Sequence, residues 1–215
     1  MNAEVRQVDN WVLRDRNPGS PGDHPIILLL HGWTGDENSM WIFANRLPQD
    51  AWLVAPRGLY PTTLGGYGWQ PGLDRTWPDI EDFRPAMEAI WKLLTPQNFP
   101  SMEMRQIHIV GFSQGAALGY SLGLAYPQQV GVLAGLSGFA PAGVESLVSS
   151  RPLAGKACFM AHGTQDQLVP VARARQARQV FLDAGAQVTY CEDDVGHKLS
   201  ASCFRGLEKF FARSV

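Results

Sequence analysis

The fold is decided by residues 107–123, which read IHIVGFSQGAALGYSLG. The apolar run from Ile107 to Val110 predicts a buried strand, and the small residues from Gln114 to Tyr126 predict a helix that ends before Pro127. Between the two lies a Gly-X-Ser-X-Gly pattern centred on Ser113. A sharp turn from strand to helix lifts a serine hydroxyl above the sheet edge, and the flanking glycines leave room for that turn. We therefore predict that Ser113 is a nucleophile.

Glycines continue along the predicted helix. Gly115, Gly119 and Gly123 recur every fourth residue, so they form one stripe on a single helix face. A stripe without side chains lets a helix approach its neighbour closely. We expect this stripe to pack against the sheet.

Strand and helix patterns alternate along the rest of the chain. Alternation of this kind predicts parallel strands joined by crossover helices, in an open sheet that is covered on both faces. We expect an α/β fold in a single domain over residues 1–215. The expected strands are Trp11–Arg14, Ile26–Leu30, Trp52–Ala55, Ile107–Val110, Val130–Leu136, Cys158–Ala161 and Val188–Cys191, and the expected helices are Asn38–Leu47, Asp79–Leu94, Gln114–Tyr126, Ala172–Ala184 and Ser200–Ala212.

Composition excludes several classes of function. The chain has 20 acidic and 18 basic residues, a net charge of −2, so it lacks the positive field that nucleic-acid binding needs. The longest aliphatic run, Ile26–Leu30, is far too short to span a bilayer, so we expect no integral membrane association. Residues Met1–Asn10 lack the apolar stretch of a signal peptide. Seven tryptophans stand out among the aromatic residues.

The cysteines suggest a reducing compartment. Cys158, Cys191 and Cys203 are odd in number and show no CxxC spacing, which argues against a disulfide framework and against a zinc site. We expect buried, reduced thiols in a cytoplasmic protein. The chain contains no HExxH, P-loop or GxGxxG motif, so we also expect no metal and no cofactor.

A second loop follows the Ile26–Leu30 strand and reads His31-Gly32-Trp33-Thr34-Gly35. Where a serine stands on this kind of turn, one oxyanion donor comes from such a loop and the other from the residue after the serine. This selects the backbone N–H groups of Trp33 and Gln114. We expect His31 to shape the loop by hydrogen bonding and not to transfer protons.

A candidate acid and a candidate base follow the last two predicted strands. Asp166 lies on the loop after Cys158–Ala161, and His197 lies on the loop before the last helix. The chain order Ser113, Asp166, His197 is the order expected for a triad in this kind of sheet. His197 would take the serine proton, and Asp166 would orient His197.

The other acidic residues and histidines fit the roles of acid and base less well than Asp166 and His197 do. Asp193 and Asp194 are nearer to His197 in sequence, but a run of acidic residues is typical of a solvated loop. His108 lies inside a strand, where a packed or hydrogen-bonded ring is expected. The remaining histidines are His24, in a turn, and His162.

Four segments together resemble one family. Residues 31–38 (HGWTGDEN), 111–115 (GFSQG), 162–166 (HGTQD) and 196–197 (GH) look like the motifs of the phospholipase/carboxylesterase family of alpha/beta-hydrolases. That family includes bacterial carboxylesterases, lysophospholipases and acyl-protein thioesterases. The resemblance covers about residues 11 to 213. It implies an alpha/beta-hydrolase fold and hydrolysis of acyl esters.

Two further segments, 55–58 (APRG) and 65–69 (GGYGW), also resemble the family. By this resemblance Trp69 is a candidate substrate contact, although a core or loop-anchoring role is an open alternative. Trp33 stands where relatives often carry a smaller apolar residue, so the family's acyl preference does not transfer directly. We expect Trp33 and Trp69 to wall a pocket for an apolar ester.

The sequence thus predicts a serine carboxylesterase that hydrolyses small to medium acyl esters through an acyl-serine intermediate. A lysophospholipase or an acyl-protein thioesterase with the same triad is the alternative, and a non-catalytic binding protein on the same scaffold is a distant one. About 20 residues separate Leu136 from Cys158, which is too few for a large lid. The expected partner is a small-molecule ester, and the sequence leaves a homodimer open.

Overall fold

The computed structural model describes residues 3–20, 24–72, 77–100 and 102–215. The turn-forming residues 21–23 and part of the irregular stretch from Leu59 to Pro78 lie outside the described residues. The elements in chain order are β1 (Glu4–Val8), β2 (Trp11–Arg16), β3 (His24–Leu30), η1 (Ser39–Arg46), β4 (Trp52–Pro56), β5 (Tyr60–Pro61), β6 (Tyr67–Gly68), η2 (Ile80–Phe83), α1 (Arg84–Leu93), β7 (Met102–Phe112), α2 (Gln114–Ala125), β8 (Val130–Leu136), α3 (Glu145–Val148), β9 (Ala157–Gly163), α4 (Val171–Asp183), β10 (Gln187–Asp193) and α5 (Ala201–Ser214).

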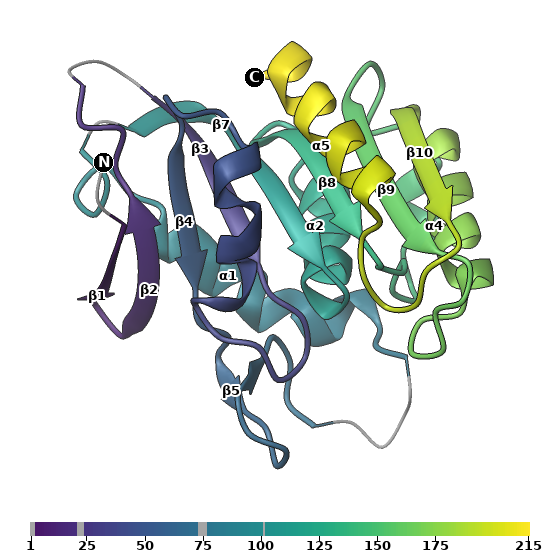
Figure 1. Cartoon of the computed structure of the whole chain (residues 1–215), viewed down its shortest axis with the longest axis horizontal. Helices are drawn as coiled ribbons and strands as arrows, with labels where there is room; N and C mark the ends of the chain where they lie inside the picture. The colour runs from purple at the N-terminus through teal and green to yellow at the C-terminus, as the bar shows by residue number, and fades with distance from the viewer. Residues whose placement is uncertain (1–2, 21–23, 73–76, 101) are drawn as a thin grey trace.

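The strands form one main sheet in the order β1-β2-β4-β3-β7-β8-β9-β10 (Figure 1). From β4 to β10 every neighbouring pair is parallel, whereas β1–β2 and β2–β4 are antiparallel. The expected mostly parallel sheet is confirmed. Because β3, β7, β9 and β10 are parallel, the loops that follow them emerge at the same edge of the sheet.

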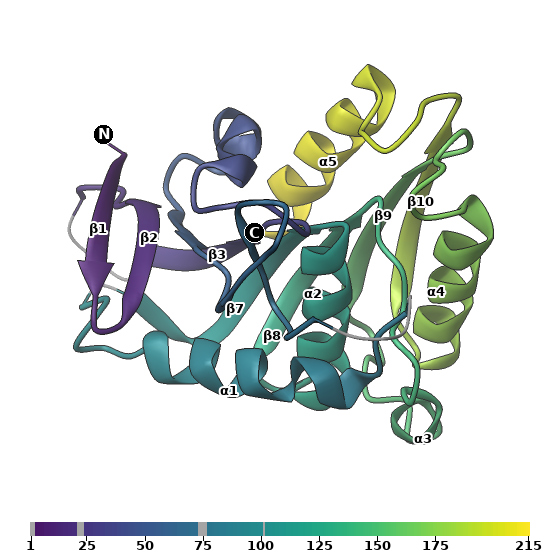
Figure 2. The same ribbon diagram turned by 90° about the horizontal axis from the view of Figure 1, so that it is seen from below.

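Helices cover both faces of the sheet. Figure 2 shows α5 and the 3₁₀-helix η1 on one side and α1, α2 and α4 on the other. Side chains alternate accordingly along β3, because Leu28 joins the core beneath α1 and α2 while Ile27 and Leu29 join the core beneath η1 and α5. A strand buried on both faces reads as an unbroken apolar run, which explains the pattern at Ile26–Leu30.

Helix α2 approaches the sheet closely through its glycine stripe. A β-carbon on Gly119 would lie 3.1 Å from the Ile109 side chain, and one on Gly123 would lie 3.1 Å from the Leu133 side chain. The expected packing of the stripe on the sheet is confirmed.

Two predicted helices differ from the structure. The expected helix over Asn38–Leu47 is the 3₁₀-helix η1. The expected helix over Asp79–Leu94 is divided into the short 3₁₀-helix η2, capped by Asp79, and the α-helix α1, which carries a proline in its first turn. Proline lacks an N–H and is suited to a helix start, so the α-helix begins there and not at Asp79.

The expectation of three reduced cysteines is wrong. Cys191 at the end of β10 and Cys203 in the first turn of α5 form a disulfide, with their Cα atoms 5.7 Å apart. Helix α5 packs against β10, which brings the two thiols into bonding range although their spacing matches no motif. Cys158 is a buried free thiol, as expected.

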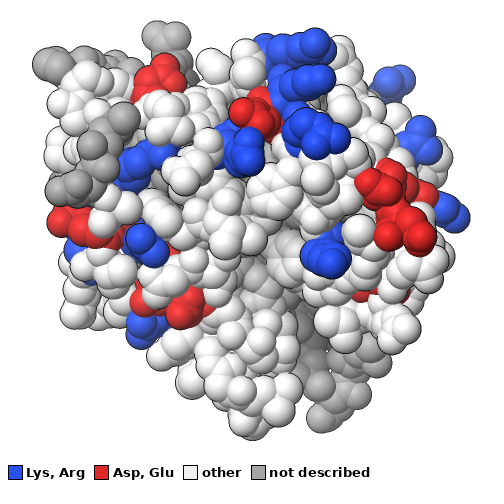
Figure 3. All heavy atoms as spheres, in the orientation of Figure 1, with Lys and Arg blue, Asp and Glu red and all other residues white. Residues whose placement is uncertain are grey.

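Charged side chains are unevenly distributed. Figure 3 shows lysine and arginine over α5, which carries Arg205, Lys209 and Arg213, while the β5–β6 hairpin presents no charged side chain. None of the helices in the described part of the chain is long and apolar enough to cross a membrane. This hairpin lies at the end of the molecule where the loops of the sheet edge gather (Figure 1).

Candidate active site

Ser113 lies on a strained turn between β7 and α2. Its backbone angles are φ 53° and ψ −116°, a region that side-chain-bearing residues rarely occupy. A β-carbon on Gly111 would collide with the backbone of Gly115, and one on Gly115 would collide with the carbonyl oxygen of Leu30. The glycine requirement inferred from the sequence is therefore confirmed, and the turn presents Ser113 at the sheet edge.

The loop after β3 is fixed by the His31 ring. Its Nδ1 lies 2.7 Å from the carbonyl oxygen of Gly32, and its Nε2 lies 2.8 Å from the backbone nitrogen of Gly58. These partners assign the proton to Nδ1, which donates, and leave Nε2 as the acceptor. Burial lowers the pKa of His31, so the ring is neutral near pH ~7. The expected loop-shaping role is confirmed.

Two backbone N–H groups are free to bind an anion beside Ser113. Neither the N–H of Trp33 nor that of Gln114 donates to any described residue. The Gln114 side chain instead accepts a 2.9 Å hydrogen bond from the Trp69 backbone, which ties the start of α2 to the β6 end. Both N–H groups keep the donor capacity that an oxyanion would use.

Trp69 holds the loops together and does not contact the cavity. Its side chain is 0% exposed, and its indole N–H donates a 2.7 Å hydrogen bond to the carbonyl oxygen of His31. This burial favours the loop-anchoring alternative for Trp69 over a direct substrate contact. Trp33 is 40% exposed and packs against Gly68, where a β-carbon would collide with its ring.

Asp166 and His197 are paired. His197 Nδ1 lies 2.6 Å from Asp166 Oδ2, and the backbone N–H groups of Leu168 and Val169 each donate a 2.9 Å hydrogen bond to Asp166 Oδ1. The carboxylate is fully buried. The geometry fixes His197 Nδ1–H as the donor, so Nε2 is the free acceptor.

His197 and Ser113 face the same cavity, which has a volume of about 740 Å³. Among the described residues, no hydrogen bond joins the Ser113 hydroxyl to His197 Nε2; such contacts commonly tighten when substrate binds. Among the described residues that line this larger cavity there is no Lys, Arg, Asp or Glu. Its remaining lining is Gly32, Trp33, Thr34, Leu64, Gln70, Gly72, Trp77, Pro78, Phe112, Gln114, Phe139, Leu168 and Val169.

The sequence profile of the phospholipase/carboxylesterase family matches residues 17–215. The chain belongs to this family of serine hydrolases. It is 29% identical over 193 residues to "Acyl-protein thioesterase 1" of Eremothecium gossypii, with 80% of each chain covered. A further relative, from rice (Oryza sativa subsp. japonica), is 27% identical over 142 residues, which are 63% of this chain and 58% of the relative, and is named a probable inactive carboxylesterase.

The fold comparison agrees. The crystal structure of a carboxylesterase from Mesorhizobium loti superposes with a TM-score of 0.82 at 22% identity, covering 99% of both chains. The alpha/beta-hydrolase fold expected from the sequence is confirmed.

In this phospholipase/carboxylesterase family member, a second buried histidine supports Asp166. His162 Nε2 lies 2.8 Å from the carbonyl oxygen of Val169 and 3.4 Å from Asp166 Oδ2, while its Nδ1 is buried without a partner. Burial lowers the pKa of His162 and keeps the ring neutral. A His-Gly pair directly follows β3, and another closes β9.

The glycines of these two pairs allow close approach of the site segments. A β-carbon on Gly163 would collide with the backbone of Val195 and Gly196, just before His197. One on Gly32 would lie 3.2 Å from the Ser113 β-carbon. Each glycine therefore lets one candidate catalytic residue reach the sheet edge.

An ion pair beneath the Trp33 loop was also missed. Glu37 and Arg57 form a bidentate pair, with nitrogen–oxygen distances of 2.7 and 2.8 Å, and the Arg57 guanidinium lies over the Tyr67 ring. Hydrogen bonding to Arg57 lowers the pKa of Glu37. The pair joins the loop after β3 to the ends of β4 and β6.

The rival residues have other partners. Asp193 accepts a hydrogen bond from the Ser202 hydroxyl, and Asp194 is exposed and meets Thr164. His108 accepts a 3.0 Å hydrogen bond from the backbone of Val132, as expected for a ring within a strand. His24 lies at the start of β3, not in a turn, and bonds to the carbonyl oxygen of Ser20. Among the described residues no His, Cys, Asp and Glu side chains are grouped as metal ligands would be.

Proposed function

We propose that the protein is a serine carboxylesterase that hydrolyses small to medium acyl esters through an acyl-Ser113 intermediate. The observation that supports this best is the 2.6 Å pairing of Asp166 with His197, whose ring borders the same cavity as Ser113. A buried carboxylate that orients a histidine beside a serine is the arrangement that activates a hydroxyl for attack.

In the proposed reaction, His197 Nε2 removes the Ser113 proton as the hydroxyl oxygen attacks the ester carbonyl. Asp166 keeps the ring in the required tautomer and stabilises the imidazolium. The N–H groups of Trp33 and Gln114 would bind the oxyanion, each contributing about 2.7–4 kcal/mol to the lowering of the barrier. Water then hydrolyses the acyl-enzyme with His197 as the base. The scheme needs neither metal nor cofactor.

An acyl-protein thioesterase or lysophospholipase is the second candidate, because the relative from Eremothecium gossypii carries the former name. None of the described residues that line the larger cavity is a charged side chain able to bind a lysophospholipid phosphate, which supports neutral esters. A panel of esters and thioesters of graded acyl length would separate these activities. The Cys191–Cys203 bond fits an oxidising compartment, so a cytoplasmic location is not part of the proposal.

The decisive experiment replaces Ser113 with alanine. We expect Ser113→Ala to fold normally and to lose turnover of p-nitrophenyl butyrate by about 10⁴-fold or more, because the nucleophile is absent. Circular dichroism gives the folding control. Activity retained in this variant would remove Ser113 from the mechanism, and a wild-type protein inactive on every ester and thioester would favour the non-catalytic binding protein.

A further inference from the structure

Two cavities, not one, adjoin His197. The larger, of about 740 Å³, is described above, and a smaller one of about 500 Å³ lies next to it. The residues that line both are Gly32, Trp33, Thr34, Phe112 and His197. The two cavities therefore lie on either side of a shared wall at the candidate active site.

The two cavities differ in whether the candidate nucleophile lines them. Ser113 and Gln114 line the larger cavity and not the smaller one. In an acyl-enzyme the acyl carbon is bonded to the serine oxygen, so we assign the acyl chain to the larger cavity, which Ser113 borders. The smaller cavity is left for the other half of an ester.

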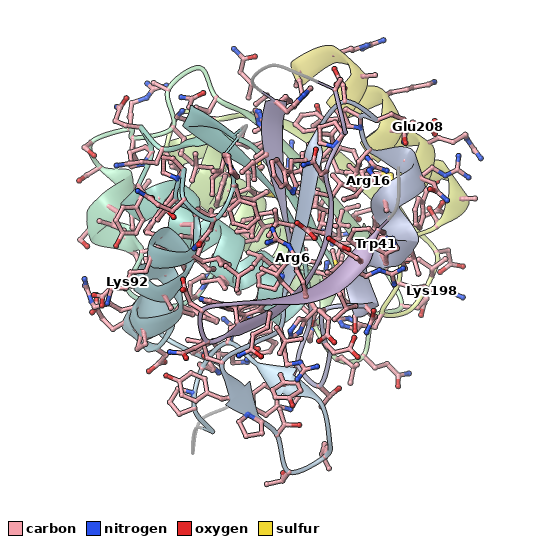
Figure 4. All side chains as sticks on the ribbon, turned by 90° about the vertical axis from the view of Figure 1, so that its left-hand side faces the viewer. Arg6, Arg16, Trp41, Lys92, Lys198 and Glu208 are labelled. Atoms are coloured by element: carbon pink, nitrogen blue, oxygen red, sulfur yellow. A yellow bond between two sulfur atoms is a disulfide. The ribbon has the colours of Figure 1, made fainter. Side chains whose placement is uncertain are left out.

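The smaller cavity lies between η1 and the start of α5, and most of the side chains that line it are apolar. Met40, Ile42 and Phe43 come from η1, and Phe204 of α5 stacks on Phe43 with ring centres 5.0 Å apart. Figure 4 labels Lys198, an exposed lining residue, on the side of the molecule that η1 and α5 occupy. Among the described lining residues Lys198 is the one with a charged side chain.

We propose that the smaller cavity binds the alcohol portion of the ester, and that this portion is an uncharged apolar chain or ring. This inference rests on the proposed esterase function. The imidazole that accepts the serine proton must return it to the departing oxygen, so that oxygen lies beside His197. His197 also lines the smaller cavity, so the chain or ring attached to that oxygen can extend into the space between η1 and α5.

The Ser113 oxygen forms a bond to the carbonyl carbon while its proton moves to His197 Nε2. When the tetrahedral intermediate collapses, the bond from carbon to the alcohol oxygen breaks with its electron pair, and His197 gives its proton to that oxygen. The free alcohol then leaves along the smaller cavity, and water enters for the second half of the reaction.

Exposed apolar side chains at the two rims give a matched test. Ile42 is 69% exposed and lines the smaller cavity, whereas Leu64 is 82% exposed and lines the larger one. Both positions tolerate a charge without loss of core packing. Two ester series are needed: acetates of methanol through 1-hexanol, and methyl esters of acetic through octanoic acid.

For the wild type, we expect kcat/KM in the acetate series to rise by up to about fourfold for each methylene that becomes buried. Ile42→Asp should flatten the rise of kcat/KM in the acetate series and leave the methyl ester series unchanged. Leu64→Asp should flatten the rise in the methyl ester series and leave the acetate series unchanged. Val5→Asp, at an exposed position on β1 that lines neither cavity, is the control for added charge. Product inhibition gives a measurement without any variant: 1-hexanol should inhibit the wild type more strongly than ethanol does.

Three outcomes contradict the inference. The first is a kcat/KM that does not change along the acetate series, together with equal inhibition by ethanol and 1-hexanol. The second is an effect of Ile42→Asp on kcat/KM that is confined to the methyl ester series. The third is an equal effect of Ile42→Asp and Leu64→Asp on both series. Each of these leaves the esterase proposal intact as long as turnover depends on Ser113. Turnover that survives Ser113→Ala would instead overturn the proposed function itself.

Discussion

Asp166 differs from the neighbouring acidic residues in the number of donors that face it. Two backbone N–H groups and the His197 ring all point at its buried carboxylate. Asp194 is exposed and meets one hydroxyl. A carboxylate with so many fixed donors holds a histidine in one orientation, which an exposed side chain does not do.

We predict that Asp166→Asn lowers kcat by about 10³- to 10⁴-fold, because an amide in this place favours the wrong histidine tautomer. Asp194→Asn should keep kcat within about twofold, since its exposed side chain bonds to Thr164 whereas His197 bonds to Asp166. Steady-state kinetics on one ester measures both. Comparable losses in the two variants would reassign the acid.

At the residue scale, sequence reasoning was strongest for residues that directly follow strands. Ser113, Asp166 and the Trp33 loop follow β7, β9 and β3, and parallel strands bring those ends together. It left two roles open for Trp69, because residue type alone does not say whether an aromatic ring on a loop turns toward the cavity or beneath it. Glu37 was missed because its partner Arg57 lies 20 residues further along the chain. The role of His162 was missed although Asp166 and Val169 are close to it in sequence, because the sequence does not show which way a ring at a strand end points.

At the element scale, the His197 loop is closed at both ends. The Cys191–Cys203 disulfide joins the strand before the loop to the helix after it, with a sequence separation of 12. His197 lies between the two cysteines, and Gly163 allows the loop to rest against the end of β9. The bond thus restrains the segment that must hold His197 in position.

We predict that the double variant Cys191→Ser/Cys203→Ser loses roughly 3 kcal/mol of unfolding free energy, the loop-closure value for a ring of this length. It should also lose kcat more than it changes KM, because the loop that carries His197 becomes more mobile. Urea denaturation and steady-state kinetics measure the two effects. Cys158→Ser is the control for altering a cysteine that is not in the bond. An unchanged kcat would show that the fold positions His197 without the bond.

The mostly parallel sheet followed from the alternation of strand and helix patterns, because parallel strands need crossover connections. The order of the strands within the sheet was not predicted. Strand β1 was missed because it is a short edge strand with few apolar residues, paired only with β2 among the described strands. The disulfide was missed because cysteine spacing carries no information about how α5 packs on β10.

At the scale of the whole molecule, three buried histidines make the fold sensitive to acid. Burial lowers the pKa of His31, His108 and His162, that of His108 to about 4. In the unfolded chain a histidine is protonated as the pH falls through about 6.5, whereas in the folded protein these three histidines are protonated only at lower pH. Stability is therefore lost as the pH falls below that value.

We predict that the free energy of unfolding declines between about pH 6.5 and about pH 4, with His108 alone contributing on the order of 3 kcal/mol. Urea denaturation across this range measures the slope. His108→Asn, whose side-chain oxygen can accept the Val132 N–H bond, should make the slope shallower. An identical slope in this variant would assign the acid sensitivity to other groups.

The disulfide also bears on how the protein is prepared. A reducing host would yield chains in which Cys191 and Cys203 are still thiols, and later exposure to air would convert a fraction of them. Such a batch would contain two species that differ by two hydrogen atoms, and its specific activity would drift with storage. Intact-mass measurement without reductant would reveal the mixture, so the oxidation state should be established before activities from different batches are compared.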